Sequence, residues 1–177
     1  MTVKLNAGDS AWSIIARKTD ADKFGDLYAL NTSTGTDTLN DIDIATGRCM
    51  DSGNAVLMSL TTGITKRIDT DWVVGTGNGG LAPSARTTPD IPNVSTTYHF
   101  HLIMNSAGLI DAGWDTSVTA TNLLSDASYT YYRRIASHAI DASSNLPLYS
   151  QLGNEFLLKT VVQSIADNAP GTSANLY

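Results

Sequence analysis

The acidic residues of this chain are almost all aspartates: 16 aspartates and one glutamate, Glu155, in 177 residues. Glu, Lys, Gln and Arg, which favour helices, number only 14, whereas Ser, Thr, Asn, Asp and Gly number 81. Short polar side chains compete with the helix for backbone hydrogen bonds and favour caps and turns, and threonine favours strands. The composition excludes a helical bundle, a coiled coil and most α/β enzymes, and it predicts a turn-rich, largely β protein.

The bulk charge and apolar content narrow the class of protein further. The formal net charge is −6, and 42% of the residues are hydrophobic, which is enough for a core and argues against global disorder. An acidic balance argues against non-specific binding to nucleic acid or to an anionic membrane. No apolar run approaches the 18 residues of a membrane span. We therefore expect no nucleic-acid partner and no membrane insertion.

The single cysteine and the first residues bear on the compartment. Cys49 alone excludes an intrachain disulfide and a cysteine zinc site. Residues 1–5 lack the apolar segment of a signal peptide. We expect synthesis in a cytoplasm, with Cys49 a reduced thiol that is either structural or free.

Short alternating segments predict eight to ten strands. Residues 41–44 alternate strictly, with Ile42 and Ile44 on one face, and residues 96–104 alternate aromatic or aliphatic side chains with His99 and His101. Further strands are predicted over 27–30, 55–60, 64–68, 72–74, 109–114, 129–138, 146–149 and 156–162. Their spacing of 8–15 residues predicts an all-β fold, an antiparallel β-sandwich of jelly-roll type with a short N-terminal arm.

The chain divides into three predicted parts. Residues 1–25 form the arm, either a first hairpin or an amphipathic helix over 8–18. Residues 26–165 form the sandwich domain. Residues 166–177 contain a linker-like Pro-Gly-Thr-Ser run and are either a linker or the start of a further region.

A glycine-rich segment at 75–80 superficially resembles a phosphate-binding loop. Such a loop needs a following helix N-terminus, but Leu81, Ala82 and Pro83 follow instead. The segment is therefore interpreted as a wide turn between strands.

His99 and His101 have the i, i+2 spacing that metal sites use on a strand. His138 or an aspartate could supply a third ligand. Because Ile103 is the next residue on the same face, a surface or edge-strand pair is the favoured interpretation.

The other candidate chemistry is unspecific. Sixteen aspartates allow many carboxylate pairs for glycoside hydrolysis, but most lie in predicted turns, where aspartate caps the backbone. Examples are Asp37, Asp51, Asp90 and Asp141. No Gly-x-Ser-x-Gly elbow is present. The aromatic residues Tyr98, Phe100 and Trp114 have strand periodicity and are expected in the core rather than on a sugar-binding platform. We assign no catalytic, cofactor-binding or metal-binding residue.

Four ordered segments resemble bacteriophage tail-fibre and related virion appendage proteins. The first two are residues 40–48 and residues 60–81, the latter with its Asp-Trp and glycine-rich stretch. A Thr-Tyr-His strand at 97–99 and a Tyr-x-Arg-Arg-Ile-x-Ser-like strand at 132–137 follow. Order and spacing agree over about residues 27–165. The family's Gln-Asp-Gly-Asp-x-Phe segment is replaced here by residues 151–156, and residues 1–25 have no counterpart.

The resemblance implies a structural virion protein without enzyme activity and without cofactors. It implies a homo-oligomer, expected to be a homotrimer. We expect the N-terminal arm to join it to other tail or capsid proteins, and host surface glycan to be a further partner. The expected role is a tail fibre or fibre base that supports host attachment, made in the bacterial cytoplasm and located in the virion. The alternatives are a head fibre or capsid-decoration protein, and a polysaccharide-degrading tailspike domain.

Overall fold

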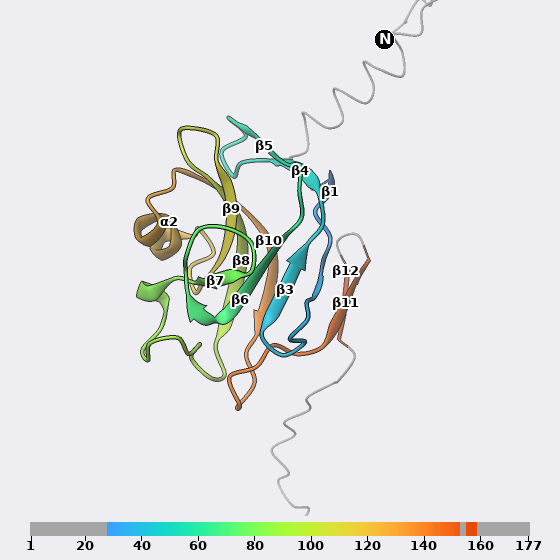
Figure 1. Ribbon diagram of the computed structural model, residues 1–177, viewed down its shortest axis with the longest axis vertical. Helices are drawn as coiled ribbons and strands as arrows, with labels where there is room; N and C mark the ends of the chain where they lie inside the picture. Colours follow the sequence, from blue (N-terminus) through green and yellow to red (C-terminus); the bar gives the residue numbers. More distant parts are fainter. Residues whose placement is uncertain (1–27, 153–154, 159–177) are drawn as a thin grey trace, which may run out of the picture.

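The computed structural model describes residues 28–152 and 155–158 (Figure 1). The predicted arm at 1–25 and the predicted tail at 166–177 lie outside the described residues, as does the end of the last predicted strand.

Twelve strands, one short 3₁₀ helix and one α-helix make up the described chain. The strands are β1 (Tyr28–Ala29), β2 (Thr32–Thr34), β3 (Asp41–Ile44), β4 (Gly47–Met50), β5 (Leu57–Leu60), β6 (Ile64–Asp71), β7 (Asn78–Leu81), β8 (Thr97–Met104), β9 (Ile110–Asp115), β10 (Tyr131–Ala139), β11 (Tyr149–Leu152) and β12 (Glu155–Leu158). The helices are η1 (Pro83–Ala85) and α2 (Thr121–Ala127).

The strands form a sandwich-like all-β fold, which confirms the predicted fold class. A seven-stranded sheet has the order β10-β8-β9-β7-β6-β3-β2, and a three-stranded sheet has the order β1-β4-β5. β11 pairs with β12 in a separate hairpin. Figure 1 shows α2 on one side of the molecule and this hairpin on the opposite side.

The large sheet is mixed rather than purely antiparallel. β7 pairs in parallel with both β6 and β9. After β6 the chain turns back, and the Gly77 N–H donates to the Thr65 carbonyl near the start of β6 at 2.8 Å. β7 then runs alongside β6 in the same direction, which a tight antiparallel hairpin does not allow.

Strand alternation places the core as predicted in β3 and β8. Ile42 and Ile44 are buried, and Phe100 stacks on Trp114 with ring centroids 4.3 Å apart. The second face of β8 is also covered, since His101 and Ile103 are fully buried. Both faces of this strand therefore lie inside the protein.

Three local elements differ from the predictions. Residues 72–74, predicted as a strand, are the start of the turn that leads to β7. α2 and β2 lie in segments for which the sequence predicts neither a helix nor a strand. No helix in residues 28–152 and 155–158 is long and apolar enough to cross a membrane.

Candidate functional site

A buried ion pair holds the glycine-rich turn at 75–80 in place. Lys66 Nζ donates to the carbonyl oxygens of Val73 at 2.7 Å and Gly75 at 3.0 Å, and it lies 3.1 Å from Asp111 Oδ1. The Gly75 N–H donates to Asp111 Oδ2 at 2.8 Å. The turn therefore directs its carbonyls to a lysine of the protein itself, which agrees with the predicted turn and differs from a phosphate cradle.

Lys66 and Asp111 are both almost fully buried, with side-chain exposures of 0% and 1%. Burial lowers the pKa of Lys66, and the negative charge of Asp111 opposes this shift. The ammonium has three acceptors, which matches its three donors. Its Nζ also lies 5.3 Å from the ring centroid of Trp72. The pair is a structural anchor for the turn.

Asp115, at the end of β9, is a second buried carboxylate with a structural role. Its Oδ1 accepts hydrogen bonds from the Ser117 N–H and from Asn122 Nδ2, both at 2.8 Å. Its Oδ2 accepts the Leu123 N–H at 2.8 Å. Asp115 thus ties the connection after β9, and the first turn of α2, to the sheet. Asp115 has no motif in the sequence that marks this role, because its partners follow at a distance of two to eight positions.

His101 is inside the protein, so the interpretation of His99 and His101 as a surface or edge-strand pair is wrong for it. Its exposure is 0%, and β8 lies between β10 and β9. His101 Nε2 is 3.1 Å from the Ser117 carbonyl oxygen, and burial lowers the pKa of His101 to about 4. His99 Nδ1 is 2.8 Å from Ser137 Oγ.

The structure does not bring His138 to the other two histidines. Its ring packs against Trp114 at 5.5 Å and Tyr149 at 4.5 Å, and its strand partner is Tyr98. Burial lowers the pKa of His138 to about 4. Within the described part of the chain, no three His, Cys, Asp or Glu side chains are grouped to hold a metal ion.

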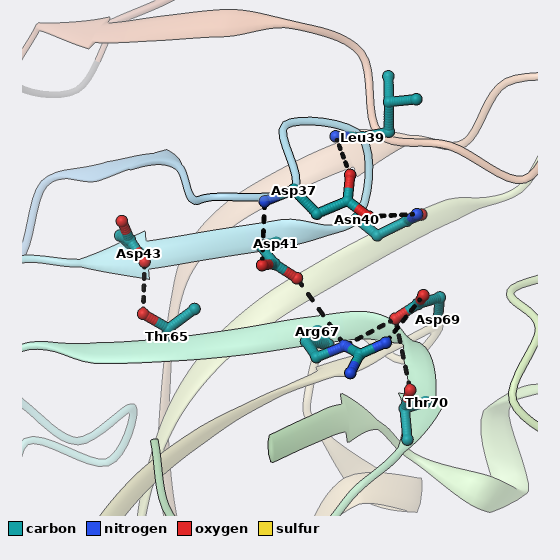
Figure 2. A network of polar contacts seen from close by, with 9 residues as sticks. All are labelled: Asp37, Leu39, Asn40, Asp41, Asp43, Thr65, Arg67, Asp69 and Thr70. Atoms are coloured by element: carbon teal, nitrogen blue, oxygen red, sulfur yellow. Dashed lines mark hydrogen bonds and ion pairs between the residues drawn. The ribbon is translucent and has the colours of Figure 1, made fainter. Parts of the chain in front are cut away.

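Aspartates on the outer side of β3 and β6 form a polar network around Arg67 (Figure 2). Arg67 Nε lies 3.3 Å from Asp69 Oδ1 and 4.0 Å from Asp41 Oδ1. Asp41 Oδ2 accepts the Asp37 N–H at 3.2 Å, and Asp43 Oδ1 accepts the Thr65 hydroxyl at 2.5 Å. These carboxylates hold a turn and two neighbouring strands together.

The aspartates predicted in turns bind backbone N–H groups. Asp51 accepts three, from Gly53, Ala55 and Val56, at 2.7–3.0 Å. Burial alone would raise the pKa of Asp51, but these bonds together hold it below its usual value. Asp37, Asp90 and Asp141 accept backbone N–H groups in the same way. Asp71 forms an ion pair with Arg86.

A hollow of about 380 Å³ is open at the edge of the large sheet, on β10. Ser52, Val118, Arg133 and Arg134 line it. The Ser52 N–H donates to the Tyr132 carbonyl at 2.8 Å, which joins the turn between β4 and β5 to this edge. The adjacent arginines were visible in the sequence, but the hollow depends on turns that are distant along the chain.

The predicted core aromatics are in the core: Tyr98, Phe100 and Trp114 have exposures of 0%. Cys49 is buried as well, and burial raises the pKa of its thiol to about 11, which suits an unreactive structural cysteine. Comparisons with family models, curated proteins and solved structures find no match.

Proposed function

We propose that this protein is a structural component of a bacteriophage virion, a tail-fibre or fibre-base protein that supports host attachment. The resembling segments supply the basis, since they contribute β3, β6, β7, β8 and β10 of the seven-stranded sheet. The resembling segments therefore contribute to five of the seven strands of that sheet, whereas β9, which separates β8 from β7, and β2 lie outside them.

The observation that carries the proposal is that buried charged side chains hold loops in place. Lys66 and Asp111 hold the turn before β7, and Asp115 holds α2, each through hydrogen bonds to backbone groups. Breaking a buried ion pair by removing one partner costs about 3–5 kcal/mol, so such contacts resist local opening. Loops that open rarely are protected from proteases, which suits a particle protein outside the cell.

Localisation tests the proposal. Particles produced from the genome that encodes this chain are purified, labelled with antibody against the chain and imaged by electron microscopy, with pre-immune serum as the control. Label on tail fibres or their base supports the proposal. Label on the head favours a head fibre or decoration protein, and particles without the chain overturn the virion role.

The absence of enzyme activity is part of the same proposal. Purified protein is incubated with host capsule and O-antigen, and released oligosaccharide is measured against a boiled sample. No release is expected. Release that depends on the folded protein would favour a tailspike depolymerase and overturn the non-enzymatic role.

A further inference from the structure

We propose that the hollow on β10, which Arg133 and Arg134 line, binds the carboxylate of an acidic saccharide through Arg134. The assignment of a saccharide rests on the proposed role in host attachment. The assignment of an anion rests on the arrangement of charged side chains in the structure.

Among the described residues, the four other basic side chains have contacts of their own. Lys66, Arg67 and Arg86 are in ion pairs with aspartates, and Arg48 lies over the Tyr28 ring at 5.2 Å from its centroid. Arg134 is exposed and has no ion pair with any residue in the described part of the chain. It is thus available to a ligand from solution.

Arg133 and Arg134 border one hollow, although neighbouring residues of a regular strand point to opposite faces. They pair in regular register with Leu102 and His101 of β8, and the register shift follows them, between Arg134 and Ala136. β10 is the last strand of the sheet. At such an edge, long side chains from either face can border the same space.

The lining of the hollow fits a sugar acid. A guanidinium forms paired, charge-assisted hydrogen bonds with a carboxylate, and the Ser52 hydroxyl can bond to a sugar hydroxyl. Val118, which is 53% exposed, offers an apolar surface to the C–H groups of a sugar ring. A volume of about 380 Å³ is larger than a bare carboxylate needs. The net charge of −6 disfavours the binding of polyanions to most of the surface. An acidic saccharide is therefore directed to this basic hollow.

The full chain is titrated with D-glucuronate, D-glucose, acetate and inorganic phosphate, and arginine Nε–H signals are followed by NMR. Glucuronate is expected to shift the Arg134 signal at millimolar concentration, and glucose is not. Arg134→Gln is expected to weaken glucuronate binding about tenfold, the size expected for loss of a hydrogen bond to a charged group. Arg134→Lys keeps the charge without the paired donors. Its affinity for glucuronate should lie between those of the wild type and Arg134→Gln. Arg48→Gln removes an exposed arginine from β4 and should leave binding unchanged.

Three outcomes overturn the proposal: no response to glucuronate at about 10 mM, equal loss in Arg134→Gln and Arg48→Gln, or acetate and phosphate binding as tightly as glucuronate. The last would leave a simple anion site. If glucuronate does not bind but antibody still labels the tail fibres, only the proposed binding site is contradicted. Intact glucuronate binding with no chain on the particles removes only the virion role.

Discussion

At the scale of single residues, the position of Lys66 shows what a sequence cannot reveal about a charge. Lys66 and Arg67 are consecutive and look alike in the sequence, yet Lys66 is fully buried and Arg67 is 46% exposed. The alternation of β6 decides this, because Ile64, Lys66 and Ile68 point inward together. What makes the burial tolerable is Asp111, which comes from a strand 45 positions later.

Lys66→Met should destabilise the protein strongly. Removal of the ammonium leaves the Asp111 carboxylate buried without a cation and frees the carbonyls of Val73 and Gly75. The expected loss in free energy of unfolding is about 3–5 kcal/mol, measured by urea denaturation at pH 7. Arg67→Met is the matched control, with an expected loss of about 0–1 kcal/mol because its ion pairs are exposed. Equal losses in the two variants would contradict the anchoring role.

The buried histidines should make stability depend on pH between about 4 and 6.5. Burial lowers the pKa of His101 and of His138 to about 4 in the folded protein, whereas an unfolded chain has a value near 6.5. The unfolded state then binds more protons in this window, so the free energy of unfolding falls as the pH falls from about 6.5 to about 4. Each histidine contributes up to about 3 kcal/mol to this fall.

The measurement is the urea midpoint as a function of pH for the wild type and for His101→Gln. Asp115, His99 and Arg134 are the charged or titratable groups that act on His101, and the variant leaves all three in place. The variant should show a shallower decline between pH 6.5 and 4. Asp51 and Asp71, whose pKa values are lowered from 3.8, add a loss of stability below about pH 5 that both proteins share. Parallel curves for the two proteins would argue against a buried neutral His101.

At the scale of elements, prediction from the sequence succeeded where alternation alone decides the structure. The strands at 41–44 and 96–104 agree with β3 and β8, because each carries apolar side chains at every second position. It failed at 72–74, where Trp72-Val73-Val74 has a strand composition. There the Lys66 ammonium donates a hydrogen bond to the Val73 carbonyl, and Trp72 Nε1 donates to the Ala112 carbonyl at 3.0 Å. These tertiary contacts override the local preference.

The helix α2 was missed for a related reason. It has only seven residues, and the residues at both of its ends, Ala120 and Ser128, have a left-handed backbone. No side chain at its N-cap position bonds to its backbone. Asp115 supplies the missing acceptor from β9. A cap that comes from another element leaves no signature next to the helix.

Asp115→Ala should therefore unfold α2 locally. The variant removes acceptors from the N–H groups of Ser117 and Leu123, and an unsatisfied buried donor costs about 1–3 kcal/mol. Amide hydrogen exchange of residues 117–127 should accelerate by more than tenfold while β3 and β6 stay protected. Asp126→Ala, which removes an exposed acceptor of Ser84 from the same helix, should leave the exchange of α2 nearly unchanged. Unchanged protection in Asp115→Ala would show that packing of Leu123 suffices.

At the scale of the whole molecule, the sheet order predicts where copies of the chain could meet. β2 is the edge strand at the opposite end of the large sheet from β10 and its hollow, and a sheet edge is a place where chains can pair. The resemblance to virion appendage proteins implies a homotrimer. Light scattering at micromolar concentration should give three times the chain mass of 18.8 kDa. A mass of one chain across the concentration range would contradict the trimer.

The arm at 1–25 should determine incorporation into the particle rather than folding. In the described part of the chain, the sheets, the Lys66–Asp111 pair and the Asp115 contacts use residues after 27, and we expect deletion of 1–25 to leave the urea midpoint within experimental error. Particles assembled with the deletion variant should lack the chain in quantitative immunoblots, whereas Arg48→Gln, which leaves the arm intact, should be incorporated at the wild-type copy number. Normal incorporation of a folded deletion variant would place the attachment surface on the sandwich itself. An unfolded deletion variant would instead make the first 25 residues part of the domain, and the predicted boundary at residue 26 would be wrong.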